Sequence, residues 1–91
     1  MFYLVECHIK CEEKLIEKLG PIIESWNHSE LAIFFRPHTV GMFGETPEHW
    51  IISGVFNESE RNNVYSLPLI IEDLGGKAWG TDIKQIDKLP D

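Results

Sequence analysis

The sequence has little positive charge. Its 91 residues include 15 acidic side chains but only eight lysines and arginines, which gives a formal net charge of −7. The few basic residues do not cluster along the chain. Because an acidic surface repels phosphate groups, we expect neither nucleic acid nor an anionic membrane as a partner.

Long hydrophobic runs are also missing. No stretch approaches the roughly 20 apolar residues of a membrane span. The N-terminal segment MFYLVECHIK carries an acidic residue within its apolar run and no basic region before it. We therefore expect no signal peptide and a cytoplasmic location, in which Cys7 and Cys11 remain free thiols.

The common motifs for binding phosphate or activating a nucleophile are absent. The chain contains no G-x-G-x-x-G, no Gly-Lys-Ser/Thr and no nucleophile elbow. What it does contain is an ordinary globular composition, with 43% apolar and 25% charged residues. This length and composition predict one small domain over residues 1–91, whose modest core would gain from dimerisation.

Hydrophobic periodicity predicts six elements. Short apolar runs predict strands, and stripes at helical spacing predict helices. The expected elements are a strand at 2–9, a helix at 12–27, strands at 31–36 and 49–56, a helix at 58–74 and a strand at 77–86. The order β-α-β-β-α-β predicts an α+β, ferredoxin-like sandwich with a four-stranded antiparallel sheet and both helices on one face.

Each predicted helix contains a proline. The first keeps its apolar stripe in phase across Gly20-Pro21 and ends with Trp26 in the core, which predicts one kinked helix. In the second, Pro68 predicts a break after Leu67 and a second helical turn that ends at the glycines 75 and 76.

Alternation along the strands predicts which side chains share a face of the sheet. The helix-facing sets are Tyr3, Val5, Cys7 and Ile9 in the first strand, and Leu31, Ile33 and Phe35 in the second. The opposite sets are Phe2, Leu4, Glu6 and His8, and Ala32, Phe34, Arg36 and His38. For the other two strands the phase stays open, between His49, Ile51, Ser53 and Val55 or Trp50, Ile52, Gly54 and Phe56, and with Trp79, Thr81 and Ile83 as one set.

The predicted fold leaves one apolar sheet face without a covering layer. A large apolar face does not stay exposed on a soluble monomer. We therefore expect a homodimer in which the sheets of two copies enclose a lined cavity.

The element order, the short chain and the passage VYSLPLI–GGK before the last strand resemble the dimeric α/β-barrel superfamily. That superfamily includes small cofactor-independent monooxygenases, muconolactone isomerase and haem-degrading proteins. The resemblance implies a homodimer with an internal cavity. It assigns no catalytic residue, because no catalytic motif of the family matches this chain.

The residues themselves suggest a candidate site on the uncovered face. Its predicted catalytic groups are His8 as base, Glu6 as its orienter, and Arg36 and His38 as stabilisers of negative charge. Its predicted lining is Phe2, Leu4, Phe34 and Trp79. This set suits proton abstraction next to a carbonyl group. It predicts an oxygenase or isomerase without a cofactor that acts on a small planar carbonyl compound.

Other interpretations remain open. The same face could hold haem or an aromatic acid without turnover, act as a regulatory or interaction module, or only set the register of a dimer. A metal site at Cys7, His8 and Cys11 is disfavoured, since Cys7 and His8 point to opposite faces of a strand. We expect His28 at a helix end and His49 at a solvated strand start.

Overall fold

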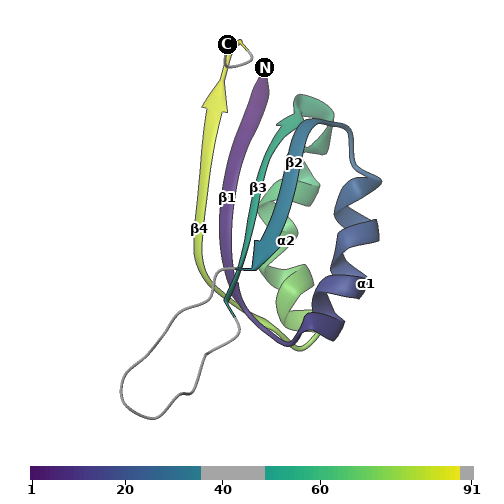
Figure 1. Cartoon of the computed structure of the whole chain (residues 1–91). Helices are drawn as coiled ribbons and strands as arrows, with labels where there is room; N and C mark the ends of the chain where they lie inside the picture. The colour runs from purple at the N-terminus through teal and green to yellow at the C-terminus, as the bar shows by residue number, and fades with distance from the viewer. Residues whose placement is uncertain (36–48, 89–91) are drawn as a thin grey trace.

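The computed structural model describes residues 1–35 and 49–88. Its elements are β1 (Phe2–Lys10), α1 (Glu13–Glu24), β2 (His28–Phe35), β3 (His49–Asn57), the short helix η2 (Glu58–Glu60), α2 (Arg61–Asp73) and β4 (Lys77–Ile86). The strands form one antiparallel sheet in the order β2-β3-β1-β4, and both helices cover the same face (Figure 1). This arrangement confirms the predicted α+β, ferredoxin-like fold.

Strand β1 lies in the middle of the sheet, as its apolar sequence predicts. It pairs with β3 on one side and with β4 on the other, so that Val5 lies between Gly54 and Ile83. The side chains of Tyr3, Val5, Cys7 and Ile9 are all buried under the helices. The predicted helix-facing set of this strand is therefore confirmed.

Helix α1 runs without a break through Gly20-Pro21, which confirms the prediction of one helix. A proline ring normally clashes with the Cβ atom of a helical residue before it, and Gly20 has no Cβ. Leu15, Leu19 and Ile23 are buried on the inner side of the helix. Trp26 follows the helix and is 8% exposed, which confirms its predicted place in the core.

The predicted break in the second helix is wrong. Helix α2 is continuous from Arg61 to Asp73, with Pro68 inside it. Val64, Leu67 and Ile71, on both sides of the proline, are fully buried. Burying three such side chains stabilises by about 1.5–3 kcal/mol each, which exceeds the cost of about 3 kcal/mol for one interior proline.

Strand β2 begins at His28, three residues earlier than predicted, so His28 lies in a strand and not at a helix end. Leu31 and Ile33 pack against the core, as predicted. Phe35 is 42% exposed and its ring contacts Trp50 at a centroid distance of 5.2 Å. The helix-facing set of β2 is thus buried only in part.

The structure resolves the phase of β3. Trp50, Ile52 and Phe56 belong to the core under the helices. Ile51 and Val55 alternate with them and lie on the other side, which we call the open face of the sheet. Both are nevertheless buried, at 3% and 1% exposure, because β3 has neighbouring strands on both sides.

A register shift in β4 places the residues that were predicted to share one face on two different faces of the sheet. Thr81 lies opposite Cys7, and Ile83 lies opposite Val5, so both share the helix-facing side. The pairing of β1 with β4 then shifts between His8 and Ile9, which leaves Trp79 as the extra residue. Trp79 contacts His8 and therefore lies on the open face. Trp79 does not belong to one set with Thr81 and Ile83.

No helix in the part of the chain that the structure describes is long and apolar enough to cross a membrane.

Candidate functional site

Two histidines and a glutamate form a chain of contacts on the open face. A hydrogen bond of 3.0 Å joins His8 Nδ1 to His49 Nε2, with one ring donating and the other accepting. On its other side, His8 Nε2 lies 3.5 Å from Glu6 Oε1. The side chain of His8 keeps 24% of its exposure and that of Glu6 keeps 57%. His8 is therefore held between two groups while it remains reachable from solvent.

The strand register explains why these groups meet. Glu6 and His8 are two residues apart on β1, so their side chains share a face. His49 is the first residue of β3 and lies opposite Lys10, one step along the open face from His8. Antiparallel pairing therefore joins the end of β1 to the start of β3 and brings the two imidazoles together.

Trp79 completes the cluster from the other side. Its ring lies 5.4 Å from the ring of His8 and 4.9 Å from the ring of His49, between centroids. The register shift in β4 is what turns the indole to this face. Trp79 is 57% exposed, so it presents a broad aromatic surface beside the histidine pair.

The chemistry of this cluster follows from the contacts that the two nitrogens of the His8 ring make. A neutral imidazole has one N–H donor and one acceptor nitrogen, and the bond at one nitrogen fixes the role of the other. If His8 donates its Nδ1–H to His49, its Nε2 lone pair is available to take a proton. The imidazolium that forms then carries a charge beside the Glu6 carboxylate, which stabilises it.

A shallow hollow of about 220 Å³ adjoins the cluster on the open face. Its lining residues are Leu4, Val5, Glu6, Ser53, Asp82 and Lys84. Glu6 thus contacts the histidine and also borders the hollow. Glu6 and Asp82 lie directly opposite each other on β1 and β4, so two carboxylates face each other at one side of it.

The structure brings together only some of the predicted site residues. His8, Glu6 and Trp79 form the cluster, and Leu4 lines the adjoining hollow. Phe34 is exposed on the open face of β2, where it lies opposite Ile51 of β3. Arg36 and His38 lie outside the described residues.

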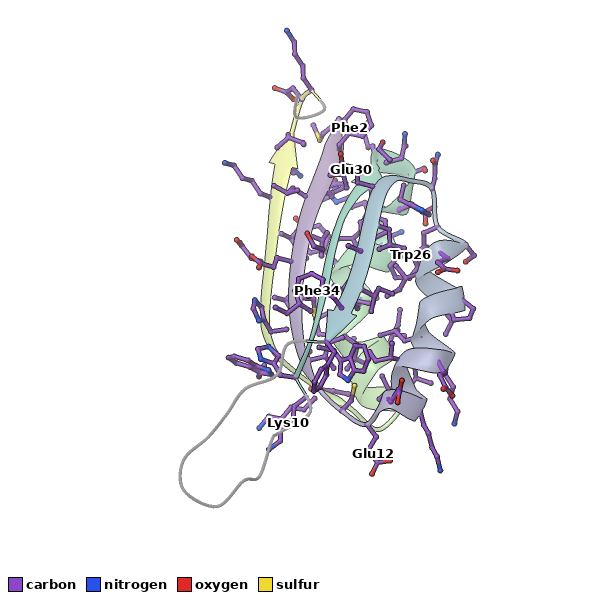
Figure 2. The ribbon with its side chains drawn as sticks, viewed as in Figure 1. Phe2, Lys10, Glu12, Trp26, Glu30 and Phe34 are labelled. Atoms are coloured by element: carbon purple, nitrogen blue, oxygen red, sulfur yellow. The ribbon has the colours of Figure 1, made fainter. Side chains whose placement is uncertain are left out.

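Phe2 is not part of the cluster. It lies opposite Ile86 near the far end of β1 from Lys10 (Figure 2). It is six positions from His8 along β1, which is about 20 Å along an extended strand. The predicted lining therefore extends over the length of the sheet and does not form one pocket.

His49 was not among the predicted site residues. It begins strand β3, as expected, but it is only partly exposed, since its ring bonds to His8 and contacts Trp79. The signal was available in the antiparallel pairing expected of these strands. A strand that ends shortly after His8 and a strand that starts at His49 place the two side chains near each other once the phase is known.

The thiols lie on the other side of the sheet. Cys7 is fully buried, and its Sγ lies 3.4 Å from Thr81 Oγ1 in a hydrogen bond. Burial raises the pKa of the Cys7 thiol, and the weaker effect of the bond to Thr81 lowers it. Cys7 and His8 therefore face opposite sides, as predicted. Within residues 1–35 and 49–88, no three His, Cys, Asp or Glu side chains are placed to hold a metal ion.

The fold and the cluster together define an α+β, ferredoxin-like domain with an imidazole pair on its open sheet face. No protein-family model matches the sequence, and a comparison with curated proteins gives no match.

Proposed function

We propose that the open face is an acid–base site that removes a proton from the carbon next to a carbonyl group of a small planar compound. The observation that carries this proposal is the chain from Glu6 through His8 to His49. An imidazole that is oriented by one partner and stabilised in its charged form by another is suited to general base catalysis.

The proposed steps use this chain directly. His8 Nε2 takes the proton from carbon, and the electron pair of the broken C–H bond moves to the carbonyl oxygen to give an enolate. His8, now charged, is stabilised by Glu6, while its Nδ1–H continues to donate to His49. Return of the proton to another carbon gives an isomer. Alternatively, molecular oxygen adds to the enolate carbon with formation of a C–O bond, the enolate supplies the two electrons that reduce the oxygen, and the resulting peroxide takes the proton from His8 to give a hydroperoxide, as in an oxygenase.

The substrate preference follows from what surrounds the histidines. Trp79 supports stacking of a planar ring, and the hollow beside Glu6 offers Leu4 as an apolar contact. We also propose that Arg36 and His38 stabilise the negative charge on the carbonyl oxygen. No cofactor is needed for proton abstraction of this kind.

A homodimer is part of the same proposal. Leu4, Phe34 and Trp79 on the open face are 37%, 45% and 57% exposed. A second copy that packs its sheet on this face would bury these side chains and enclose the histidine pair. Exclusion of water strengthens the interaction between the charged imidazole and Glu6.

The test is exchange of carbon-bound hydrogen for deuterium in 2-tetralone, a ketone fused to a planar aromatic ring, followed by NMR in deuterated buffer. We expect the protein to accelerate exchange next to the carbonyl, and His8→Ala to lower the rate by about a hundredfold or more. His28→Gln is the matched control, because His28 bonds to the Trp26 carbonyl oxygen away from the site. Exchange no faster than in buffer, or equal loss in both variants, would contradict the proposal.

A second candidate is binding without turnover, which the exposure of Trp79 favours. An aromatic acid stacked on this indole would quench its fluorescence, and haem bound by a histidine would shift its Soret band. Binding that is lost in His8→Ala, together with no deuterium exchange in the unaltered protein, would favour this candidate over catalysis.

A further inference from the structure

A second concavity lies at the end of the helix layer. It has a volume of about 540 Å³ and is lined by Lys10, Cys11, Glu12, Lys14, Leu15, Lys18, Leu74 and Gly75. These residues come from the end of β1, the start of α1 and the segment after α2. The volume is within the range of about 300–1,000 Å³ that is typical of small-molecule sites.

The concavity combines an apolar floor with a basic rim. Leu15 is 6% exposed and Leu74 packs partly against the core, so both offer apolar surface near the bottom. Three lysines, one glutamate, Cys11 and Gly75 line the remainder. An excess of positive charge at one place is unusual for a chain whose net charge is −7.

Within residues 1–35 and 49–88, none of the three lining lysines forms an ion pair with an acidic side chain, although Glu12 lines the same concavity. Lys10 lies opposite Lys77 on β4 and opposite His49 on β3, so its cross-strand neighbours are also basic. Lys14 and Lys18 are one helical turn apart, where like charges repel. This end of the molecule therefore carries unfavourable like-charge pairs that a bound anion would relieve.

The start of α1 adds to the same potential. The first main-chain N–H groups of a helix have no acceptor within the helix and carry a partial positive charge. Glu12 caps α1, but its side chain accepts no hydrogen bond from these groups. Glu12 and Lys10 lie at the same end of the molecule in Figure 2.

We infer that this concavity, which we call the lysine pocket, binds a small organic anion with an apolar body, such as a medium-chain carboxylate. The lysines neutralise the anionic group, while Leu15 and Leu74 contact the apolar part. Long lysine side chains suit this role, because their stems pack on apolar surface and their ammonium groups reach solvent. The lysine pocket shares no lining residue with the histidine cluster, and the inference does not depend on the proposed function.

The test is titration of the full chain with octanoate, followed by methyl NMR. We expect saturable shifts of the Leu15 and Leu74 methyl signals, and weaker binding at higher salt because rim charges are screened. The double substitution Lys14→Gln and Lys18→Gln should weaken binding by about fivefold, the scale of two lost surface ion pairs. Lys84→Gln is the control for position, since it removes one lysine charge beside the hollow on the open face, away from the lysine pocket.

Three outcomes would overturn the inference. Equal affinity in the double variant and in Lys84→Gln would exclude a role for the pocket lysines. Equal affinity for neutral 1-octanol would remove the need for an anion. Shifts confined to Leu4 and Ile51 would place the ligand on the open face and not in the lysine pocket.

Discussion

Burial controls the protonation state of the Cys7 thiol. The folded protein raises the pKa of this thiol above its ordinary value of 9.0, mainly by desolvation. A raised folded pKa favours the protonated thiol, so its contribution to stability is complete below about 9.0 and is lost as the pH rises through the folded pKa. We expect the free energy of unfolding to fall more steeply above this pH in the native sequence than in Cys7→Ala, measured by urea denaturation at several pH values.

Val5→Ala is the control for this measurement. Val5 is buried on the same strand, so its truncation also leaves a cavity but retains the thiol. Its alkaline decline should match that of the native sequence. If Cys7→Ala declines equally steeply, other groups cause the alkaline loss of stability.

Gly76 is a position where the backbone approaches other atoms too closely for a side chain. A Cβ atom there would lie 2.7 Å from Leu15 Cδ1, 3.1 Å from Ile71 Cγ2 and 3.2 Å from Cys11 Cβ. We expect Gly76→Ala to lower the free energy of unfolding by about 1–3 kcal/mol, because the packed neighbours must move. In Gly80→Ala the new atom would be 3.8 Å from His8 Cβ, and we expect little change. Thermal unfolding compares the two variants, and equal effects would contradict the prediction.

At the level of the secondary-structure elements, Pro68 lowers the stability of α2 without interrupting the helix. It removes one helical hydrogen bond and restricts Leu67 before it. We expect Pro68→Ala to raise the free energy of unfolding by about 1–3 kcal/mol, because the lost bond is restored at a partly buried position. Leu69→Ala, at a neighbouring position that is 63% exposed, is the control and should change little. A less stable Pro68→Ala protein in chemical denaturation would show that the ring itself is needed for packing.

Periodicity was sufficient to predict the elements but not their local irregularities. The stripes of α1 and the alternation in β1 follow directly from burial, and both were predicted correctly. The continuity of α2 depends on packing energy that compensates for Pro68, which the local sequence does not display. The phase of β3 depends on which of two apolar faces meets the helices, and both faces of that strand are buried.

The same local irregularities limited how much of the candidate site could be predicted from the sequence. His8, Glu6 and Trp79 were predicted to share a face, yet Trp79 reaches it only through the register shift of β4. His49 was missed because its contact with His8 depends on strand phase. The lysine pocket was not predicted either, although Lys10, Lys14 and Lys18 recur every four residues in the sequence.

At the scale of the whole molecule, the open face predicts self-association. We expect a homodimer with twice the 10.5 kDa mass of one chain in analytical ultracentrifugation. Phe34→Glu should shift the equilibrium toward the monomer, because Phe34 is 45% exposed on this face. Leu69→Glu, which adds the same charge on α2, should leave the dimer intact. A monomer at every concentration would contradict this part of the proposal.

The proposed reaction requires that the bond to His49 holds His8 as a base. Nitrogen-15 NMR of the histidine rings in mildly alkaline buffer reads which nitrogen of each ring carries the proton. The proposal predicts that His8 is protonated at Nδ1, with a coupling across the hydrogen bond to His49 Nε2 that disappears in His49→Ala. His28, which lies apart from the cluster, is the reference ring. His8 protonated at Nε2 instead, with its Nδ1 accepting the hydrogen bond from His49 Nε2–H, would contradict the proposed base.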